Sequence, residues 1–149
     1  MFSKKSQSIT QADIDSLEQL IGYKLPIDFI SHYLSSNGGI SDKSFFYVER
    51  DYGYVEIKLF LPIKYPNDSF GDIRIEESYN KLVSIGVPQN YVPFAIDHGG
   101  NYFSLDINTN DIVMIYMDLG EVTEEAIRYL TTGFSSFIDN LEEEGEGDV

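Results

Sequence analysis

Three apolar segments joined by short turns, between residues 92 and 117, constrain the fold of this chain most. Residues 92–97, 102–107 and 112–117 are rich in β-branched and aromatic side chains. Gly99-Gly100 separates the first two segments, and Asn108-Thr109-Asn110-Asp111 separates the last two. Connections this short join antiparallel neighbours, because parallel strands need a long crossover. The sequence therefore predicts an antiparallel meander.

Four further segments carry the apolar spacing and the start and stop signals of helices. Thr10 and Asp13 form a variant of the capping box before the first helix, and Gly22 supplies its left-handed stop. Pro26 suits the first position of the second helix. The predicted helices span residues 11–21, from Pro26 to the residue before Asn37, 73–85 and 134–143. In the second helix the apolar stripe comprises Ile27, Ile30 and Leu34, with Phe29 and Tyr33 beside it.

Alternation with period two predicts additional strands at residues 45–48 and 54–61, joined by a turn at 50–53. Residues 62–72 are typical of a loop, and residues 122–132 suit either a helix or a strand. The prediction is an α+β fold with a central antiparallel sheet of about five to six strands, ending in a meander. Two N-terminal helices, a middle helix and a C-terminal helix pack around this sheet. We expect one domain over residues 1–141 and a disordered acidic tail over 142–149.

Composition limits the class of protein. The chain has 149 residues, 42% hydrophobic and 14% aromatic, which is enough for a full core. It has no cysteine, so disulfides, thiol catalysis and thiolate metal sites are excluded. Residues 1–10 lack the apolar run of a signal peptide, and no segment approaches the roughly 18 apolar residues of a membrane span. We therefore expect a cytoplasmic protein that does not associate with membranes.

The charge is strongly negative, with 25 acidic against 10 basic residues and a formal net charge of −15. Five of the acids lie in the tail, so the remaining chain still carries −10. Such a surface repels nucleic-acid phosphates and anionic membranes, and it attracts basic proteins. Solubility alone is an equally good explanation of the charge.

The polar residues contain no complete catalytic or metal-binding pattern. His32 lies within a predicted helix, where a packed or surface role is expected, and His98 precedes two glycines in a predicted hairpin turn. An esterase-type oxyanion loop at His98 would need a Gly-x-Ser-x-Gly elbow, and the most similar segment, residues 133–137, lacks the second glycine. Residues 106–111 begin like a calcium loop, but Asp111 and Met117 replace its required Gly and Glu. We expect no catalytic residue, no cofactor and no metal.

Three motifs occur in order along the chain. The first runs from Leu25-Pro26 through Phe29 and Tyr33-Leu34 to Asn37-Gly38-Gly39. The second is the segment from Pro93 to Asp106, and the third runs from Gly133 to Leu141. Together these motifs resemble the SUKH superfamily, which includes fungal cell-wall-assembly regulators and many bacterial immunity proteins. The residues that carry the fold motif are Pro26, Gly38, Gly39, Pro93, Phe94, Gly99, Gly100 and Asp106.

The resemblance implies an α+β domain that works by binding another protein. In bacteria it commonly implies an immunity protein that neutralises a cognate toxin, and many such toxins are basic nucleases. The alternative is an intracellular regulatory or scaffolding module of the fungal type, with no toxin. An enzyme is a third hypothesis, which a pocket of buried acids would favour. The sequence makes no prediction of the oligomeric state.

Two surfaces are candidates for binding the partner. One is the tyrosine-rich stretch from Tyr47 to Glu56, and the other combines residues 97–101 with residues 118–121. Asp97 and Asp106 have a second interpretation, in which their carboxylates accept hydrogen bonds from turn amides. The candidate partner-binding residues are Tyr52, Tyr54, Glu56, Asp97, His98, Asn101, Asp118 and Glu121.

Overall fold

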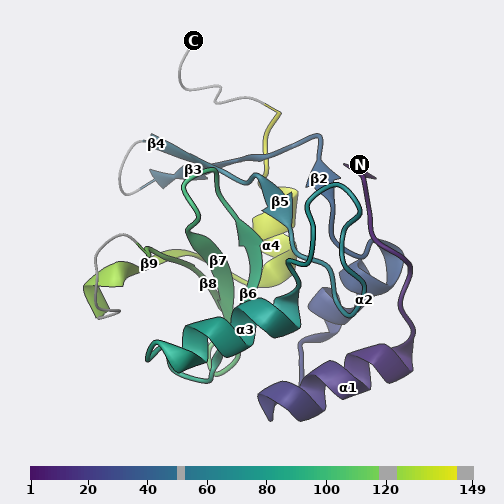
Figure 1. The fold of residues 1–149 in the computed structure, drawn as a ribbon. Helices are drawn as coiled ribbons and strands as arrows, with labels where there is room; N and C mark the ends of the chain where they lie inside the picture. The colour runs from purple at the N-terminus through teal and green to yellow at the C-terminus, as the bar shows by residue number, and fades with distance from the viewer. Residues whose placement is uncertain (50–52, 118–123, 144–149) are drawn as a thin grey trace.

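The computed structural model describes residues 1–49, 53–117 and 124–143 (Figure 1). Its main element is a five-stranded antiparallel sheet in the order β5-β6-β7-β8-β9. The strands are β5 (Leu59–Phe60), β6 (Tyr91–Ile96), β7 (Tyr102–Asp106), β8 (Asp111–Ile115) and β9 (Ile127–Thr132). The predicted meander is confirmed as β6-β7-β8. The ambiguous segment 122–132 contributes a short 3₁₀ turn, Glu124–Ala126, followed by β9.

In the described part of the chain, four α-helices pack around the sheet: α1 (Gln11–Ile21), α2 (Ile27–Ser35), α3 (Ile75–Ser84) and α4 (Phe134–Asp139). Helix α3 packs against β6, in front of the sheet in Figure 1, whereas α4 contacts β8, β9 and α2. Pro26 immediately precedes α2 rather than opening it. Helix α4 ends four residues earlier than predicted, because the chain must extend for Glu142 to pair with the backbone of Phe45 at 3.0 and 2.8 Å. No helix in the described part of the chain has the length and apolar character needed to cross a membrane.

The prediction that residues 54–61 form a single strand is wrong. The structure divides it into β4 (Gly53–Glu56), which pairs with β3 (Phe45–Val48) in a separate hairpin, and β5 of the main sheet. The amide of Ile57 donates to Ser44 O at 2.7 Å, and the next amide, of Lys58, donates to Ile96 O at 2.8 Å. The chain therefore changes partner between residues 57 and 58. A third small sheet pairs β1 (Phe2–Ser3) with β2 (Ile40–Ser41).

The core face of α2 also differs from the prediction. Ile27 is 82% exposed and Leu34 is 39% exposed, whereas Phe29 and Tyr33 are completely buried. Aromatic rings bury more apolar area than the aliphatic side chains beside them. The hydroxyl of Tyr33 donates to Leu61 O at 2.8 Å, so its polar end is also satisfied inside the core.

Aromatic residues join the layers of the core. The ring centroid of Phe134 on α4 lies 4.9 Å from that of Phe29 on α2 and 5.2 Å from that of Phe94 on β6. Phe137 also contacts Phe94, at 5.6 Å, and Phe103, at 5.9 Å. These edge-to-face and tilted contacts connect α2 to the meander through α4.

The Asn37-Gly38-Gly39 motif has a structural role. Gly38 has φ +74°, and a Cβ there would lie 2.7 Å from the carbonyl oxygen of Phe60. Gly39 has φ +106°, and its Cβ would collide with the carbonyl oxygen of Ser3. Only glycine combines these conformations with such close backbone approach. The motif therefore brings the N-terminal segment and the end of β5 together.

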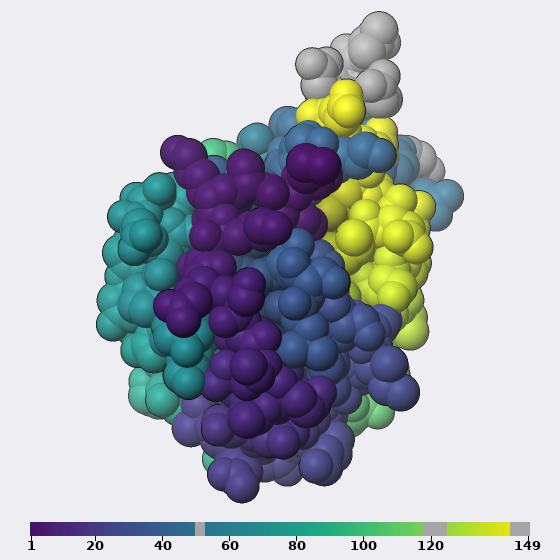
Figure 2. Space-filling model, turned by 90° about the vertical axis from the view of Figure 1, so that its right-hand side faces the viewer, coloured from purple at the N-terminus to yellow at the C-terminus, as the bar shows by residue number. Residues whose placement is uncertain are grey.

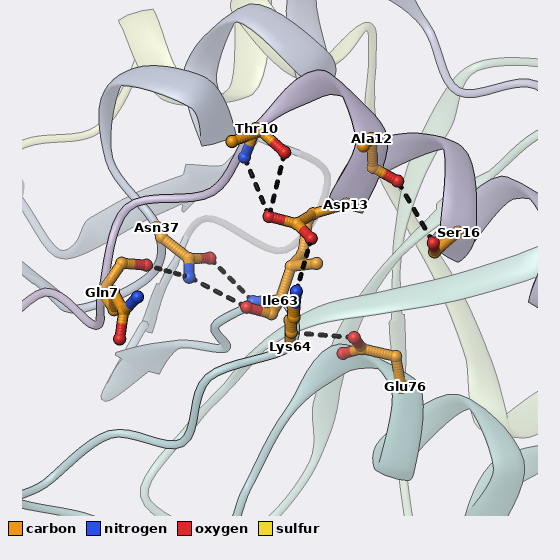
Figure 3. A network of polar contacts seen from close by, with 9 residues as sticks. All are labelled: Gln7, Thr10, Ala12, Asp13, Ser16, Asn37, Ile63, Lys64 and Glu76. Carbon is orange, nitrogen blue, oxygen red and sulfur yellow. Dashed lines mark hydrogen bonds and ion pairs between the residues drawn. The ribbon is translucent and has the colours of Figure 1, made fainter.

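The N-terminal segment lies on the surface, where Figure 2 shows it in purple between teal residues and blue residues. The amide of Ser6 donates to Asn37 O at 3.1 Å, and Asn67 Nδ2 donates to Lys4 O at 2.7 Å. Further along, the Asp13 carboxylate accepts from the amide of Thr10 at 2.9 Å and from Lys64 Nζ at 2.8 Å (Figure 3). Its hydrogen bond and ion pair with Lys64 lower the pKa of Asp13. These contacts hold the first segment and α1 against the middle of the chain.

Candidate functional site

The structure brings parts of the two candidate surfaces together at one hollow of about 320 Å³. One side is strand β4 of the hairpin, the other is the turn between β6 and β7, and β8 contributes the floor. We call this site the hairpin hollow. Its lining residues are Tyr54, Val55, Glu56, Asp97, His98, Gly99, Met114 and Tyr116. Segments about 40 positions apart in the sequence thus form a single surface.

The hairpin fixes the position of Tyr54. Its ring meets that of Tyr47, its cross-strand partner, edge to face with centroids 5.1 Å apart. Its hydroxyl donates to Glu142 Oε1 at 3.1 Å. These contacts hold the half-buried ring at the side of the hollow, which limits the conformational entropy that it would lose on binding.

Asp97 and Asn101 organise the turn between β6 and β7. Asp97 Oδ1 accepts from the amides of Gly99 and Asn101 at 2.9 and 2.8 Å, and its Oδ2 accepts from Asn101 Nδ2 at 3.0 Å. Asn101 Oδ1 in turn accepts from the amide of Met117 at 2.9 Å, which ties the turn to the end of β8. Gly100 has φ +85°, as this turn requires. The Asp97 carboxylate therefore has a structural role: it accepts hydrogen bonds from amides of the turn, as its second interpretation predicts.

Glu56 and His98 form the polar rim of the hollow. Glu56 Oε2 lies 3.6 Å from His98 Nε2, and both side chains are exposed. This contact is an ion pair only when His98 is protonated, and an exposed pair of this kind is weak. The Glu56 carboxylate is therefore accessible to a cationic group of another molecule.

The floor of the hollow was not predicted. Met114 is buried and Tyr116 is half-buried, and Arg128 Nη1 donates to the Tyr116 hydroxyl. Antiparallel pairing of β7 with β8 puts the end of β8 beside the start of β7, and thus beside the 97–101 turn. This register is the signal that would have pointed to Tyr116. The floor is apolar and aromatic, whereas the rim is acidic.

Other polar residues that the sequence singled out are structural. The Asp106 carboxylate, 9% exposed, accepts from Asn90 Nδ2 at 2.8 Å and from the amide of Asn108 at 3.0 Å, as expected of a turn. Across the described ranges, no three His, Cys, Asp or Glu side chains gather as a metal site would require. Tyr52, Asp118 and Glu121 lie outside the described residues.

His32 is packed within the protein rather than in a site. Its ring lies 4.9 Å from that of Phe2, 5.2 Å from that of Phe134 and 5.5 Å from that of Tyr33. Burial lowers the pKa of His32 to about 4, because the charged ring would lose its hydration among these aromatic groups.

Comparisons with known proteins agree with this architecture. The family model described as the SMI1 / KNR4 family (SUKH-1) matches residues 8–140. No curated protein matches the sequence. The crystal structure of a protein from Pseudomonas syringae pv. tomato superposes with a TM-score of 0.50 at 15% sequence identity, covering 80% of this chain and 74% of that one. At this identity the likeness concerns the fold alone.

Proposed function

Because this chain belongs to the SMI1/KNR4 family (SUKH-1), we propose that it is a non-catalytic, protein-binding domain. Membership of this family supports a protein-interaction or immunity-type domain. Within that class, we propose that the chain is an immunity protein, which neutralises a cognate toxin by binding it. The hairpin hollow is the proposed binding surface.

The observation that carries the proposal is the composition of the hairpin hollow. A buried methionine floor lies next to two half-buried tyrosines, and an exposed carboxylate stands at the rim. Aromatic residues in a concave site are typical energetic centres of protein interfaces, and a polar rim excludes water around them. Hydrogen bonds from the amides of Gly99 and Asn101 to the Asp97 carboxylate hold the 97–101 turn, so one wall of the hollow is formed before a partner arrives.

The chemistry of the hollow favours a basic side chain of the partner. An arginine or lysine stem would lie along Tyr54 and Tyr116, with its charged group at Glu56. The formal net charge of −15 would steer a basic protein toward the surface and raise the association rate. Arginine suits the site best, because its planar guanidinium both stacks on tyrosine and pairs with a carboxylate.

Co-purification with the product of the neighbouring gene tests the proposal. We expect a stable complex, inhibition of that product's toxicity when both are expressed, and reduced hydrogen exchange at β4 and the 97–101 turn. The Glu56→Gln variant removes the carboxylate at the rim of the hollow. Its matched control is Glu77→Gln, which removes one carboxylate on the exposed side of α3. A neighbouring product that neither binds nor is inhibited would overturn the immunity function. Protection confined to surfaces away from the hollow would overturn the assigned site.

A further inference from the structure

We propose that the outer edge of strand β9 accepts an extended, basic segment of a partner protein as an added strand. This surface is distinct from the hairpin hollow. The inference rests on the proposed function in one respect, because the segment belongs to a protein that this chain binds. It goes beyond that function by naming a second contact and its mode of recognition.

The two edges of the main sheet are treated differently. At the β5 edge, Gly39 and Phe60 exchange two backbone hydrogen bonds, each 2.9 Å long, so this edge is covered. Strand β9 forms the opposite edge, and within the described ranges no strand pairs with its outer side. β9 has six residues, which is long enough to template another strand. Unpaired backbone amides and carbonyls on such an edge are the recognition element for strand addition.

A hollow of about 370 Å³ lies between β9 and the hairpin strand β3, and we call it the edge groove. Its lining residues are Phe46, Tyr47, Glu49, Leu130, Thr131, Asn140 and Glu142. Strand β3 forms the other side of the groove. Within the described ranges, Phe45 is the only residue of β3 that pairs outside the hairpin, and its partner is Glu142. The groove can therefore receive the side chains of a strand that lies along β9.

A bulge in β9 gives the groove its apolar wall. Val113 pairs with Tyr129 and Ile112 pairs with Thr131, so Leu130 has no partner residue on β8. Bulges of this kind redirect a side chain, and Leu130 lines the groove opposite Phe46 and Tyr47 of β3. Alternate side chains of an added strand would therefore meet an apolar surface.

Charge selects the occupant. Among the described residues that line the edge groove, the charged ones are Glu49 and Glu142, and both are acidic. Glu49 is exposed, whereas Glu142 is half-buried and accepts from the Tyr54 hydroxyl. An extended segment with alternating apolar and basic side chains satisfies both features, because one set packs on Leu130 and the other reaches Glu49.

A set of synthetic peptides tests the proposal on the full chain. The probe is an acetylated, amidated octapeptide of alternating lysine and valine. Two controls of identical charge carry N-methyl groups, one on all lysine amides and the other on all valine amides. A strand added in one orientation presents only one of these two sets of amides to β9. We expect one methylated peptide to bind at least about tenfold more weakly and the other to bind as the parent does.

Hydrogen exchange locates the bound peptide. We expect the parent peptide to slow exchange of β9 amides and to leave the β5 edge unchanged. Leu130→Asn and Glu49→Gln should each weaken binding, and Glu77→Gln should not. Equal affinity of all three peptides, or protection away from β9, would overturn strand addition, since simple attraction between opposite charges gives that result. If the neighbouring gene product still binds at the hairpin hollow, only strand addition fails; if it does not bind and β9 is protected, only the proposed function fails.

Discussion

The side chain of Asn37 hydrogen-bonds the backbone of Ile63 in both directions: Nδ2 donates to Ile63 O at 2.9 Å, and Oδ1 accepts from Ile63 N at 2.7 Å (Figure 3). Its second amide hydrogen goes to Gln7 O at 2.8 Å. Asn37 is only 2% exposed, and these bonds pair both hydrogens and the oxygen of its buried amide. One side chain thus connects the end of α2 to the N-terminal segment and to the residues that follow β5.

Replacement of Asn37 by alanine should therefore destabilise the protein strongly. It leaves three backbone groups without their partner, each of which costs on the order of 1–3 kcal/mol when buried. We expect the free energy of unfolding, measured in urea, to fall by about 3 kcal/mol or more. The control is Asn80→Ala on the exposed side of α3, which should change it by less than about 0.5 kcal/mol. Equal effects of the two substitutions would contradict the role given to Asn37.

Gly38 and Gly22 separate steric collision from backbone strain. Their φ angles are similar, +74° and +79°, but a Cβ at Gly22 would meet no atom within 4 Å, whereas one at Gly38 would meet backbone atoms of Phe60 and Pro62. Gly22→Ala should lower the free energy of unfolding by about 1–2 kcal/mol, the left-handed strain alone. Gly38→Ala should cost several kcal/mol more, or prevent folding. Equal melting temperatures of the two variants would contradict the explanation that close backbone approach requires glycine at position 38.

His32 should make stability depend on pH. Its pKa is about 4 in the folded protein and about 6.5 when unfolded, because burial disfavours the charged ring. The unfolded state therefore binds more protons between these values, so the contribution of His32 is complete above pH 6.5 and declines as the pH falls toward 4. His32→Phe keeps an aromatic ring and removes this titration. Urea titrations from pH 7 to pH 4 should show a shallower decline for this variant than for the native chain. An equally steep decline for the two proteins would contradict the burial of His32 among aromatic rings.

Glu142 belongs to the folded structure rather than to the tail predicted for residues 142–149. Its backbone pairs with Phe45 at 3.0 and 2.8 Å, and its carboxylate accepts from the Tyr54 hydroxyl at 3.1 Å. A chain that ends after Leu141 should therefore be less stable than one that ends after Glu143, by about 1–3 kcal/mol for these bonds. Comparison of their melting temperatures isolates this contribution. Identical melting temperatures would mean that the pairing of Glu142 with β3 does not contribute to stability.

The elements that the sequence predicts well are those that local signals define. The meander follows from alternating apolar segments and turn residues, and α1 follows from its capping box and Gly22. The break at residues 57 and 58 does not follow, because it depends on Ser44 and Ile96, which are remote in the sequence. The alternation of residues within the segment gives no information about this change of strand-pairing partner.

The core face of α2 and the binding surface illustrate the same limit. Ile27, Ile30 and Leu34 have helical spacing as good as that of Phe29 and Tyr33, and only the surrounding rings decide which stripe is buried. The sequence predicts Tyr54 and Glu56 as part of one surface, and Asp97 and His98 as part of another. Their meeting in one hollow depends on how the hairpin packs beside the main sheet, which is tertiary information.

The kinetics of the complex with the neighbouring gene product test the central claim most directly. Tyr54→Ala should raise the dissociation rate at least about tenfold, as expected of an aromatic anchor. Tyr54→Phe should change it far less, because the ring remains. Glu56→Gln should lower the association rate and flatten its dependence on salt, since charges on the rim act over the Debye length of about 8 Å at physiological salt and about 30 Å at 0.01 M.

Stopped-flow association and dissociation across a salt series therefore give the deciding measurement, with Glu77→Gln as the control of equal charge. The proposal predicts a steep fall of the association rate with salt for the native chain and a dissociation rate that responds to Tyr54→Ala. A partner whose association is independent of salt, and whose dissociation is the same with tyrosine or alanine at position 54, would contradict binding at the hairpin hollow.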